Sequence, residues 1–333
     1  MNVASYSLGS TGLKVSRIGL GLAALGRPAY INLGHAEDLD GDIDVYALEA
    51  RAHEVLDAAY QLGVRYFDAA RSYGKAEQFL GRWLQSRQIP RDSVTVGSKW
   101  GYIYTADWKI DATTHEIKEH SLPVLQRQWT ESRSMLGEYL RLYQIHSATL
   151  ESGVLDNIPV LNELARLKRE GVFIGLTTSG SNQSEILTKA IRIEIEGVRL
   201  FDTVQATWNL LEPSATETLS WAHETGMGVI IKEALANGRL TSKNQDPSFA
   251  NQRQLLEQQA KRLNTSLDAL ALAAVLAQPW VDVVLSGATT IDQLRSNLTA
   301  LDVRWDEEAA AKLASLVEPP SVYWEKRSRL AWN

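Results

Sequence analysis

The chain contains no cysteine. Disulfide bonds and thiolate chemistry are therefore excluded, and a cytoplasmic location is favoured. The sequence also lacks any apolar run that approaches the ~20 residues needed to span a membrane as a helix. Its first residues, Met1 to Tyr6, do not show the basic and then apolar pattern of a secretion signal. We therefore expect a cytoplasmic protein that does not bind membranes.

The sequence also shows no excess of basic over acidic residues. The formal net charge is -6, the pI is near 5.6, and no basic stripe stands out, which argues against nucleic acid as a partner. With 333 residues, 44% of them hydrophobic and 22% charged, the chain has the composition of an ordinary globular protein and can bury a large core. Tryptophan is abundant, and Trp and Tyr side chains often wall small-molecule pockets.

The order of predicted elements points to an α/β fold. After a hairpin at residues 5–16, apolar strands are predicted near residues 18, 64, 94, 141, 173, 204, 229 and 282, and helices alternate with most of them. Crossover helices of this length join parallel strands. Eight such units predict a closed (β/α)8 TIM barrel with an N-terminal β-hairpin and C-terminal extra helices, forming one domain over residues 1–333. An open doubly wound sheet is the alternative.

Three sequence patterns that can mark cofactor or metal sites do not predict such a site here. Gly19 to Ala24 matches the glycine fingerprint of dinucleotide-binding folds, but no helix is predicted to begin there, so a turn at a strand end is favoured. His115 and His120 are five residues apart and would point ~140° from each other if they shared one helix, so one metal ion could not bind both from that helix. The acidic stretch 37–44 lacks the glycine and final acid of a calcium loop. We expect a solvated flap at 37–44 and no metal site.

Polar residues that handle protons follow three consecutive predicted strands. Asp68, Lys99 and His146 lie at or just past the ends of the second, third and fourth strands, and Tyr73 follows Asp68 by five residues. In a parallel barrel these strand ends share one rim, and adjacent strands are only ~4.8 Å apart. Any one of these residues alone would more often be solvated or ion-paired. Together, at neighbouring strand ends, they predict one catalytic site.

These four side chains suit carbonyl chemistry. A tyrosine keeps its proton at neutral pH, and a nearby ammonium would lower the pKa of Tyr73 toward the working range. Asp68 would pair with Lys99, and His146 would orient a carbonyl oxygen or relay a proton. The set suits protonation of a carbonyl oxygen while a hydride reaches the carbon. Since no nucleophile is present among them, acyl or glycosyl transfer fits less well.

Several segments, in the same order, make the sequence resemble the aldo-keto reductase family over nearly its whole length. The resembling segments are 8–16, 67–74, 98–99, 144–146, 175–178, 205–208 and 287–297. The resemblance implies a (β/α)8 barrel that binds NADP(H) in an extended form across the C-terminal rim. It also implies a catalytic tetrad, which falls on Asp68, Tyr73, Lys99 and His146.

The resemblance places the nicotinamide half of the cofactor near the fifth and sixth strands. Thr177 and Thr178 stand where a Ser-Asn pair usually holds the nicotinamide amide, and Gln205 matches a third contact. Trp208 stands where an aromatic ring usually stacks on the nicotinamide. Gly21, at the end of the first strand, is a further candidate contact.

The other half of the cofactor is expected along the seventh and eighth strands. Backbone contacts to the pyrophosphate are implied at Leu235, Gly238 and Leu240, although Glu233 replaces the usual serine and would repel phosphate unless Lys232 or Lys243 offsets it. The remaining candidate contacts are Gly287, Gln293 and Asn297. We expect NADP(H), with NAD(H) possible because no cation lies between Gly287 and Gln293, where some family members carry Lys and Arg.

These observations predict an NAD(P)(H)-dependent oxidoreductase. It would reduce an aldehyde, ketone or sugar carbonyl, or oxidise the alcohol, with Tyr73 as general acid and base. The substrate would be a small carbonyl compound in a pocket walled by residues 27–44, the aromatic loop 100–108 and the C-terminal aromatic residues. Two alternatives are a cofactor-binding regulatory subunit on the same fold, as in the channel β subunits of this family, and a lyase or isomerase barrel.

Overall fold

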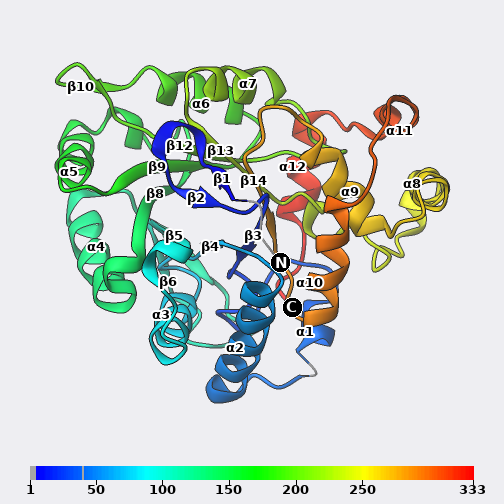
Figure 1. Cartoon of the computed structure of the whole chain (residues 1–333), viewed down its shortest axis with the longest axis horizontal. Helices are drawn as coiled ribbons and strands as arrows, with labels where there is room; N and C mark the ends of the chain where they lie inside the picture. The colour runs from blue at the N-terminus through cyan, green and yellow to red at the C-terminus, as the bar shows by residue number, and fades with distance from the viewer. Residues whose placement is uncertain (1–4, 40) are drawn as a thin grey trace.

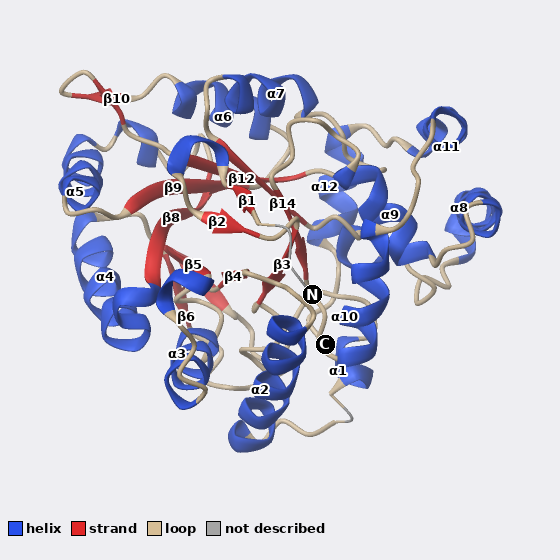
Figure 2. Ribbon diagram, in the orientation of Figure 1, coloured by secondary structure: helices blue, strands red, loops and turns tan. Residues whose placement is uncertain are grey.

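The computed structural model describes residues 5–39 and 41–333. Eight parallel strands form a closed barrel, and pairing of the last strand with the first completes the ring. In chain order the barrel strands are β3 (Ile18–Gly21), β4 (Tyr66–Asp68), β5 (Thr95–Trp100), β8 (Leu140–Ala148), β9 (Phe173–Thr178), β12 (Thr203–Thr207), β13 (Gly228–Lys232) and β14 (Val283–Ser286). Figure 2 shows these strands at the centre with helices around them. The predicted (β/α)8 barrel is confirmed.

Helices cover the outside of the barrel (Figure 1). The surrounding helices are α2 (Val45–Gln61), α3 (Ala76–Ser86), α4 (Leu122–Leu136), α5 (Ile158–Arg169), α6 (Gln183–Ile191), α7 (Thr216–Glu224), α9 (Leu267–Leu276) and α10 (Ile291–Leu298). Helix α8 (Ala250–Arg262) packs on α9, outside this ring. Local sequence sets their ends: Asp44 begins α2 by accepting hydrogen bonds from the backbone N–H groups of Tyr46 and Ala47. The predicted extra C-terminal helices are present as α11 (Glu307–Leu313) and α12 (Pro320–Ser328).

The N-terminal hairpin closes one end of the barrel. Its strands are β1 (Tyr6–Ser7) and β2 (Lys14–Val15), and in Figure 1 this dark blue segment lies across the barrel opening. Its buried side chains pack against residues of the barrel interior, in a cluster of Leu8, Leu13, Val15, Tyr66, Leu142, Ile230 and Val283. Gly9 permits the close approach, since its φ is +51° and a Cβ would lie 2.4 Å from the backbone nitrogen of Gly228. Ligand access is therefore left to the C-terminal rim.

Three segments differ from the sequence-based prediction. The helix expected over 117–136, with a bend at Pro123, begins at Leu122, and Pro123 lies in its first turn, where the missing N–H is not needed. Residues before it form an antiparallel pair, β6 (Tyr102–Tyr104) with β7 (Glu116–Lys118). A second unpredicted hairpin, β10 (Glu194–Ile195) with β11 (Val198–Arg199), follows α6. Such short strands carry too few residues for a periodic signal.

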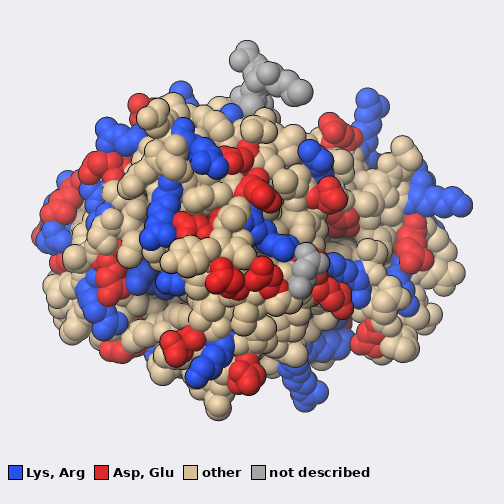
Figure 3. Space-filling model, turned by 90° about the horizontal axis from the view of Figure 1, so that it is seen from below, with Lys and Arg blue, Asp and Glu red and all other residues tan. Residues whose placement is uncertain are grey.

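The surface seen in Figure 3 carries acidic and basic side chains interspersed with each other. In the described part of the chain, no helix is both long enough and apolar enough to cross a membrane. Across residues 5–39 and 41–333, no cluster of three or more His, Asp or Glu side chains is arranged to hold a metal ion.

Candidate active site

A buried ion pair lies at the centre of the C-terminal rim. Asp68 is the last residue of β4, and Lys99 lies near the end of β5, the strand hydrogen-bonded to β4. Lys99 Nζ forms an ion pair with Asp68 Oδ2, and the two side chains are 0% and 3% exposed. Lys99 Nζ also donates a hydrogen bond to the backbone oxygen of Ala69 at 2.9 Å. The pair expected from the sequence is therefore present, and both of its charges are removed from solvent.

The second oxygen of Asp68 accepts hydrogen bonds from side chains of three strands. Asp68 Oδ1 accepts hydrogen bonds from Tyr66 Oη at 3.0 Å, Gln144 Nε2 at 3.2 Å and Gln205 Nε2 at 3.1 Å. These donors come from β4, β8 and β12, and Lys99 adds β5. Both carboxylate oxygens are thus bound, which fixes the position of the Lys99 ammonium.

Tyr73 and His146 lie above this ion pair. Tyr73 Oη is 3.4 Å from His146 Nε2, and Lys99 Nζ is 4.8 Å from the centre of the Tyr73 ring. Ser72 Oγ lies 3.4 Å from the other ring nitrogen, Nδ1 of His146. The turn that carries Tyr73 depends on Gly74, whose φ is +58° and whose added Cβ would lie 2.5 Å from the Gly26 oxygen. The structure therefore brings all four predicted side chains together.

Burial controls protonation at this site. Burial, reinforced by the charge of Asp68 and opposed by Arg27, raises the pKa of Tyr73 well above its usual value of 10. The sequence-based expectation of a lowered Tyr73 pKa was therefore wrong for this structure, because burial and the Asp68 carboxylate together outweigh the nearby positive charge. Burial, together with the charges of Lys99 and Lys232, lowers the pKa of His146 well below 6.5. At neutral pH Tyr73 is a phenol and His146 is a neutral imidazole.

Three buried histidines make the protein sensitive to acid. Burial lowers the pKa of His35 and of His120 to about 4, and that of His146 also lies well below 6.5. Below about pH 6.5 these histidines bind protons in the unfolded chain but not in the folded one, so the free energy of unfolding falls as the pH decreases toward about 4. Each histidine contributes a slope of up to about 1.4 kcal/mol per pH unit.

Urea unfolding at about pH 7, 6 and 5 measures this slope. The variant His35→Gln removes one of the three histidines and should flatten the slope between pH 6 and 5 by roughly one third. Equal slopes for the variant and the parent protein would contradict the assignment of a neutral, buried His35.

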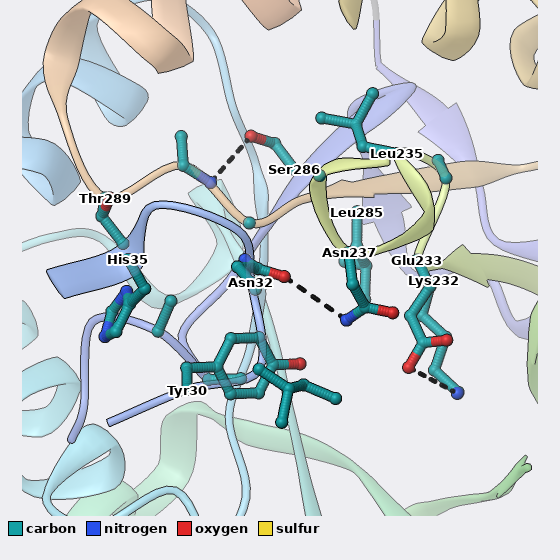
Figure 4. A pocket seen from close by; sticks show the side chains of 18 of the residues that line it. Tyr30, Asn32, His35, Lys232, Glu233, Leu235, Asn237, Leu285, Ser286 and Thr289 are labelled. Carbon is teal, nitrogen blue, oxygen red and sulfur yellow. Dashed lines mark hydrogen bonds and ion pairs between the residues drawn. The ribbon is translucent and has the colours of Figure 1, made fainter. Parts of the chain in front are cut away.

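An elongated cavity of about 580 Å³ begins at this cluster and extends along the rim. Asp68, Tyr73 and His146 line it at one end, whereas Lys99 lies beneath it and is fully buried. Most of the predicted cofactor residues also line this cavity, namely Gly21, Thr177, Gln205, Leu235, Gly238, Gly287, Gln293 and Asn297. Figure 4 shows Leu235 and Asn237 on one wall, with Tyr30 and His35 facing them.

Three predicted cofactor residues pack away from the cavity. Thr178 follows Thr177 along β9 and therefore points to the opposite face of the strand, into the core. Trp208 packs edge-to-face on Trp280, at 5.8 Å between ring centres, and its indole N–H donates to Thr216 Oγ1 at 2.8 Å. Leu240 belongs to a second apolar cluster with Phe249. Side-chain contacts of Thr178 and Trp208 with the cofactor are therefore not supported. Leu240, expected to contact the pyrophosphate through its backbone, is not among the described residues that line the cavity.

Two of the predicted contacts already have partners within the protein. Thr177 Oγ1 accepts a hydrogen bond from the backbone N–H of Ser147 at 2.7 Å, and Gln205 Nε2 donates to Asp68. Of the aromatic residues expected in the pocket wall, Tyr102 and Trp332 line the cavity, whereas Trp100 is fully buried.

Glu233, the residue expected to repel phosphate, is neutralised from two sides. Arg327 Nε lies 3.0 and 2.9 Å from the two carboxylate oxygens, and Lys232 Nζ lies 3.6 Å from Oε1. Burial opposes ionisation of Glu233, but Arg327 and Lys232 outweigh it and hold the pKa of Glu233 at about 2. Burial also lowers the pKa of Lys232 to about 8. Of the two lysines considered from the sequence, Lys232 provides part of this compensation, whereas Lys243 pairs with Asp38.

The outer wall of the cavity joins two segments that are distant in sequence. Residues 30–38, which include the short helix α1 (His35–Asp38), pair with the C-terminal residue. Tyr30 N donates to Asn333 O at 3.0 Å, Asn333 N donates back to Tyr30 O at 3.1 Å, and Asn333 Nδ2 donates to Asn32 O. The prediction of a solvated flap over 37–44 is therefore wrong at Asp38, because this residue lines the cavity. Residue 40 lies outside the described residues.

The cavity has the polar surface that a dinucleotide requires. Asn237 Oδ1 and the ring nitrogens of His35 lack a well-aligned hydrogen-bond partner in the described ranges, although these side chains are only 5% and 1% exposed. Both residues line the cavity. A Cβ added to Gly287 would contact only the Asn32 side chain, at 3.8 Å, so the chain leaves room there. Unpaired polar groups beside open space fit an elongated polar ligand.

The barrel and the cluster at its rim define a (β/α)8 enzyme fold with a dinucleotide-sized cavity. The model of the aldo/keto reductase family matches residues 17–318, and the chain belongs to this family. Uncharacterized oxidoreductase YqkF of Bacillus subtilis (strain 168) is 26% identical, with 96% of this chain and 98% of that protein aligned. NADH-specific methylglyoxal reductase of Escherichia coli (strain K12) is also 26% identical, over 93% of this chain and 97% of its own length.

A solved structure shows the same fold. Aldo-keto reductase AKR11C1 from Bacillus halodurans, in its holo form, superposes with a TM-score of 0.72 at 22% identity. The superposition covers 96% of this chain and 97% of that chain. It supports the barrel assignment, while the roles of individual residues depend on the site itself.

Proposed function

We propose that this protein is an NAD(P)(H)-dependent oxidoreductase that reduces an aldehyde, ketone or sugar carbonyl, or oxidises the corresponding alcohol. The observation that carries the proposal is the phenol of Tyr73, which lines the cavity 3.4 Å from His146 Nε2 and directly above the Lys99–Asp68 pair. Family membership supports oxidoreductase activity in general. The relative from Escherichia coli is described as a reductase of methylglyoxal, which carries carbonyl groups.

In this proposal Tyr73 is the general acid and base. Its raised pKa keeps the proton on the phenol at neutral pH, ready for transfer to a carbonyl oxygen. The Lys99 ammonium, held by Asp68, stabilises the phenolate that forms as the proton leaves. Neutral His146 presents Nε2 beside the same oxygen and orients it. In alcohol oxidation Tyr73 takes the proton back.

The cavity residues hold the cofactor and keep water away from the reacting atoms. Nicotinamide, when bound, supplies or accepts the hydride. Thr177 and Gln205 would lie near the nicotinamide, and Leu235 and Gly238 would approach the pyrophosphate through their backbone. Gly287, Gln293 and Asn297 would contact the adenosine half. From the family resemblance alone the cofactor would be NADP(H).

A carbonyl panel tests this function. Purified protein is mixed with NADH or NADPH and with aldehydes, ketones and sugars, and oxidation of the cofactor is followed by absorbance. We expect oxidation that depends on the carbonyl compound with at least one of the two cofactors. Tight cofactor binding without turnover of any carbonyl would instead favour a regulatory subunit, and activity that does not require nicotinamide would favour a lyase or isomerase.

A further inference from the structure

The cavity has a second end, away from the catalytic cluster. From Tyr73 and His146 it passes Leu235 and Asn237 and reaches the start of α10, where Thr289 and other residues line it. Figure 4 shows part of the cavity, with Lys232 and Glu233 at one side and His35 and Thr289 at the other. If Tyr73 delivers the proton, the nicotinamide must lie at the first end. The adenosine half of an extended dinucleotide then lies at the second end.

This second end carries more negative than positive charge. Its lining includes three carboxylates, Asp38, Asp268 and Asp292, and among the described residues that line it one ammonium, Lys243. Arg295 lines an adjoining outer hollow that shares Thr289 and Asp292 with the cavity. Its Nη1 lies 3.9 Å from Oδ1 of the exposed Asp292, so it offsets part of one of these three charges. Arg51 lines that outer hollow too, and its guanidinium donates to the backbone oxygen of Asp38. The net charge of the lining therefore disfavours an additional phosphate.

Asp38 is held in place at this end. Asp38 Oδ2 accepts hydrogen bonds from Gln293 Nε2 at 2.8 Å and from Thr289 Oγ1 at 3.2 Å. Asp38 Oδ1 forms an ion pair with Lys243, whose Nζ also donates to the Gly34 oxygen at 3.1 Å. The Asp38 side chain is only 17% exposed, so solvent screens its charge incompletely. The Lys243 ammonium, the group here suited to bind a phosphate, is thus already paired with a carboxylate.

From this geometry we infer that the cavity binds NAD(H) in preference to NADP(H), and that Asp38 is the residue that discriminates between them. A fixed carboxylate accepts a hydrogen bond from a ribose 2′-hydroxyl and repels a 2′-phosphate. Asn237 Oδ1, which lines the same cavity and has no well-aligned hydrogen-bond partner among the described residues, independently indicates a polar ligand in this part of the cavity. The inference rests on the proposed function and reverses the NADP(H) expectation drawn from the resemblance.

Equilibrium binding of NADH and NADPH, followed by tryptophan fluorescence or calorimetry, tests this inference without turnover. The parent protein should bind NADH at least about tenfold more tightly than NADPH. This is the effect expected when one carboxylate, partly screened by its surroundings, repels the 2′-phosphate at close range. In Asp38→Asn the ratio of the two dissociation constants should shift toward NADPH by about tenfold. Glu37→Gln, an exposed neighbour on the same short helix that does not line the cavity, is the matched control and should leave the ratio unchanged.

A double variant identifies the source of the change. Once Asp38 is replaced, Lys243 is free to bind a phosphate, so adding Lys243→Met to Asp38→Asn should remove the gain in NADPH affinity. Circular dichroism confirms that each variant is folded. Tighter binding of NADPH by the parent protein, or a ratio unchanged by Asp38→Asn, would overturn the inference while leaving the proposed function intact. Failure of a folded parent protein to bind either cofactor would overturn both.

Discussion

Replacing Tyr73 by phenylalanine should lower kcat for carbonyl reduction by about 10²–10⁴-fold, the usual contribution of a positioned general acid. The phenol lines the cavity beside His146, and its raised pKa keeps the transferable proton in place. Phenylalanine retains the ring that lies over the Lys99 ammonium but has no proton to donate. Cofactor affinity and the free energy of unfolding should therefore change little. Steady-state kinetics with a carbonyl identified in the panel, together with cofactor titration, measures both quantities.

The change Tyr104→Phe provides the control for this experiment. Tyr104 lies in β6, a few residues beyond Tyr102, and it does not line the cavity among the described residues. Removing its hydroxyl group should leave kcat within about twofold of the parent value, as surface substitutions usually do. Turnover by Tyr73→Phe at a rate similar to that of this control would disprove the assignment of Tyr73 as proton donor.

Replacing Lys99 by methionine should abolish activity and also destabilise the fold. The ammonium is fully buried and paired with Asp68, so its removal leaves an uncompensated carboxylate inside the barrel. Breaking a buried ion pair in this way costs about 3–5 kcal/mol. Urea unfolding gives the change in stability, and the carbonyl assay gives the change in turnover.

The double variant Asp68→Asn with Lys99→Met separates the two effects. With the carboxylate replaced by an amide of similar shape, most of the lost stability should return, because no unpaired charge remains. Turnover should stay low, since no ammonium remains near Tyr73. If the double variant were no more stable than Lys99→Met alone, the loss would have to come from packing and not from the unpaired charge.

Periodic and local signals predicted much of the fold. Apolar runs near residues 64 and 94 predicted strands, and the structure has β4 (Tyr66–Asp68) and β5 (Thr95–Trp100) there. Asp68 and Lys99 were predictable as partners because parallel neighbouring strands bring their ends to one rim. The cavity walls were not predictable in this way. Tyr30 and Asn333 meet only through tertiary packing of irregular segments, which carry no periodic pattern.

Sequence position gives neither the direction of a side chain nor its charge environment. Thr178 matches a cofactor-binding position of the family, yet it points into the core because side chains alternate along a strand. The pKa of Tyr73 was expected to fall because of a nearby lysine. That expectation omitted both burial and the Asp68 carboxylate, and these two together raise the pKa.

The convergence of four strands on Asp68 also affects how this protein can change during evolution. Side chains from β4, β5, β8 and β12 meet at one carboxylate, so a substitution there disturbs folding and chemistry together. Such positions tolerate few mutations. Residues 328–332, which also wall the cavity, carry fewer of these shared constraints. Selection for a new substrate should therefore accumulate changes in these walls, while the proton-handling centre and the barrel interior are inherited as one unit.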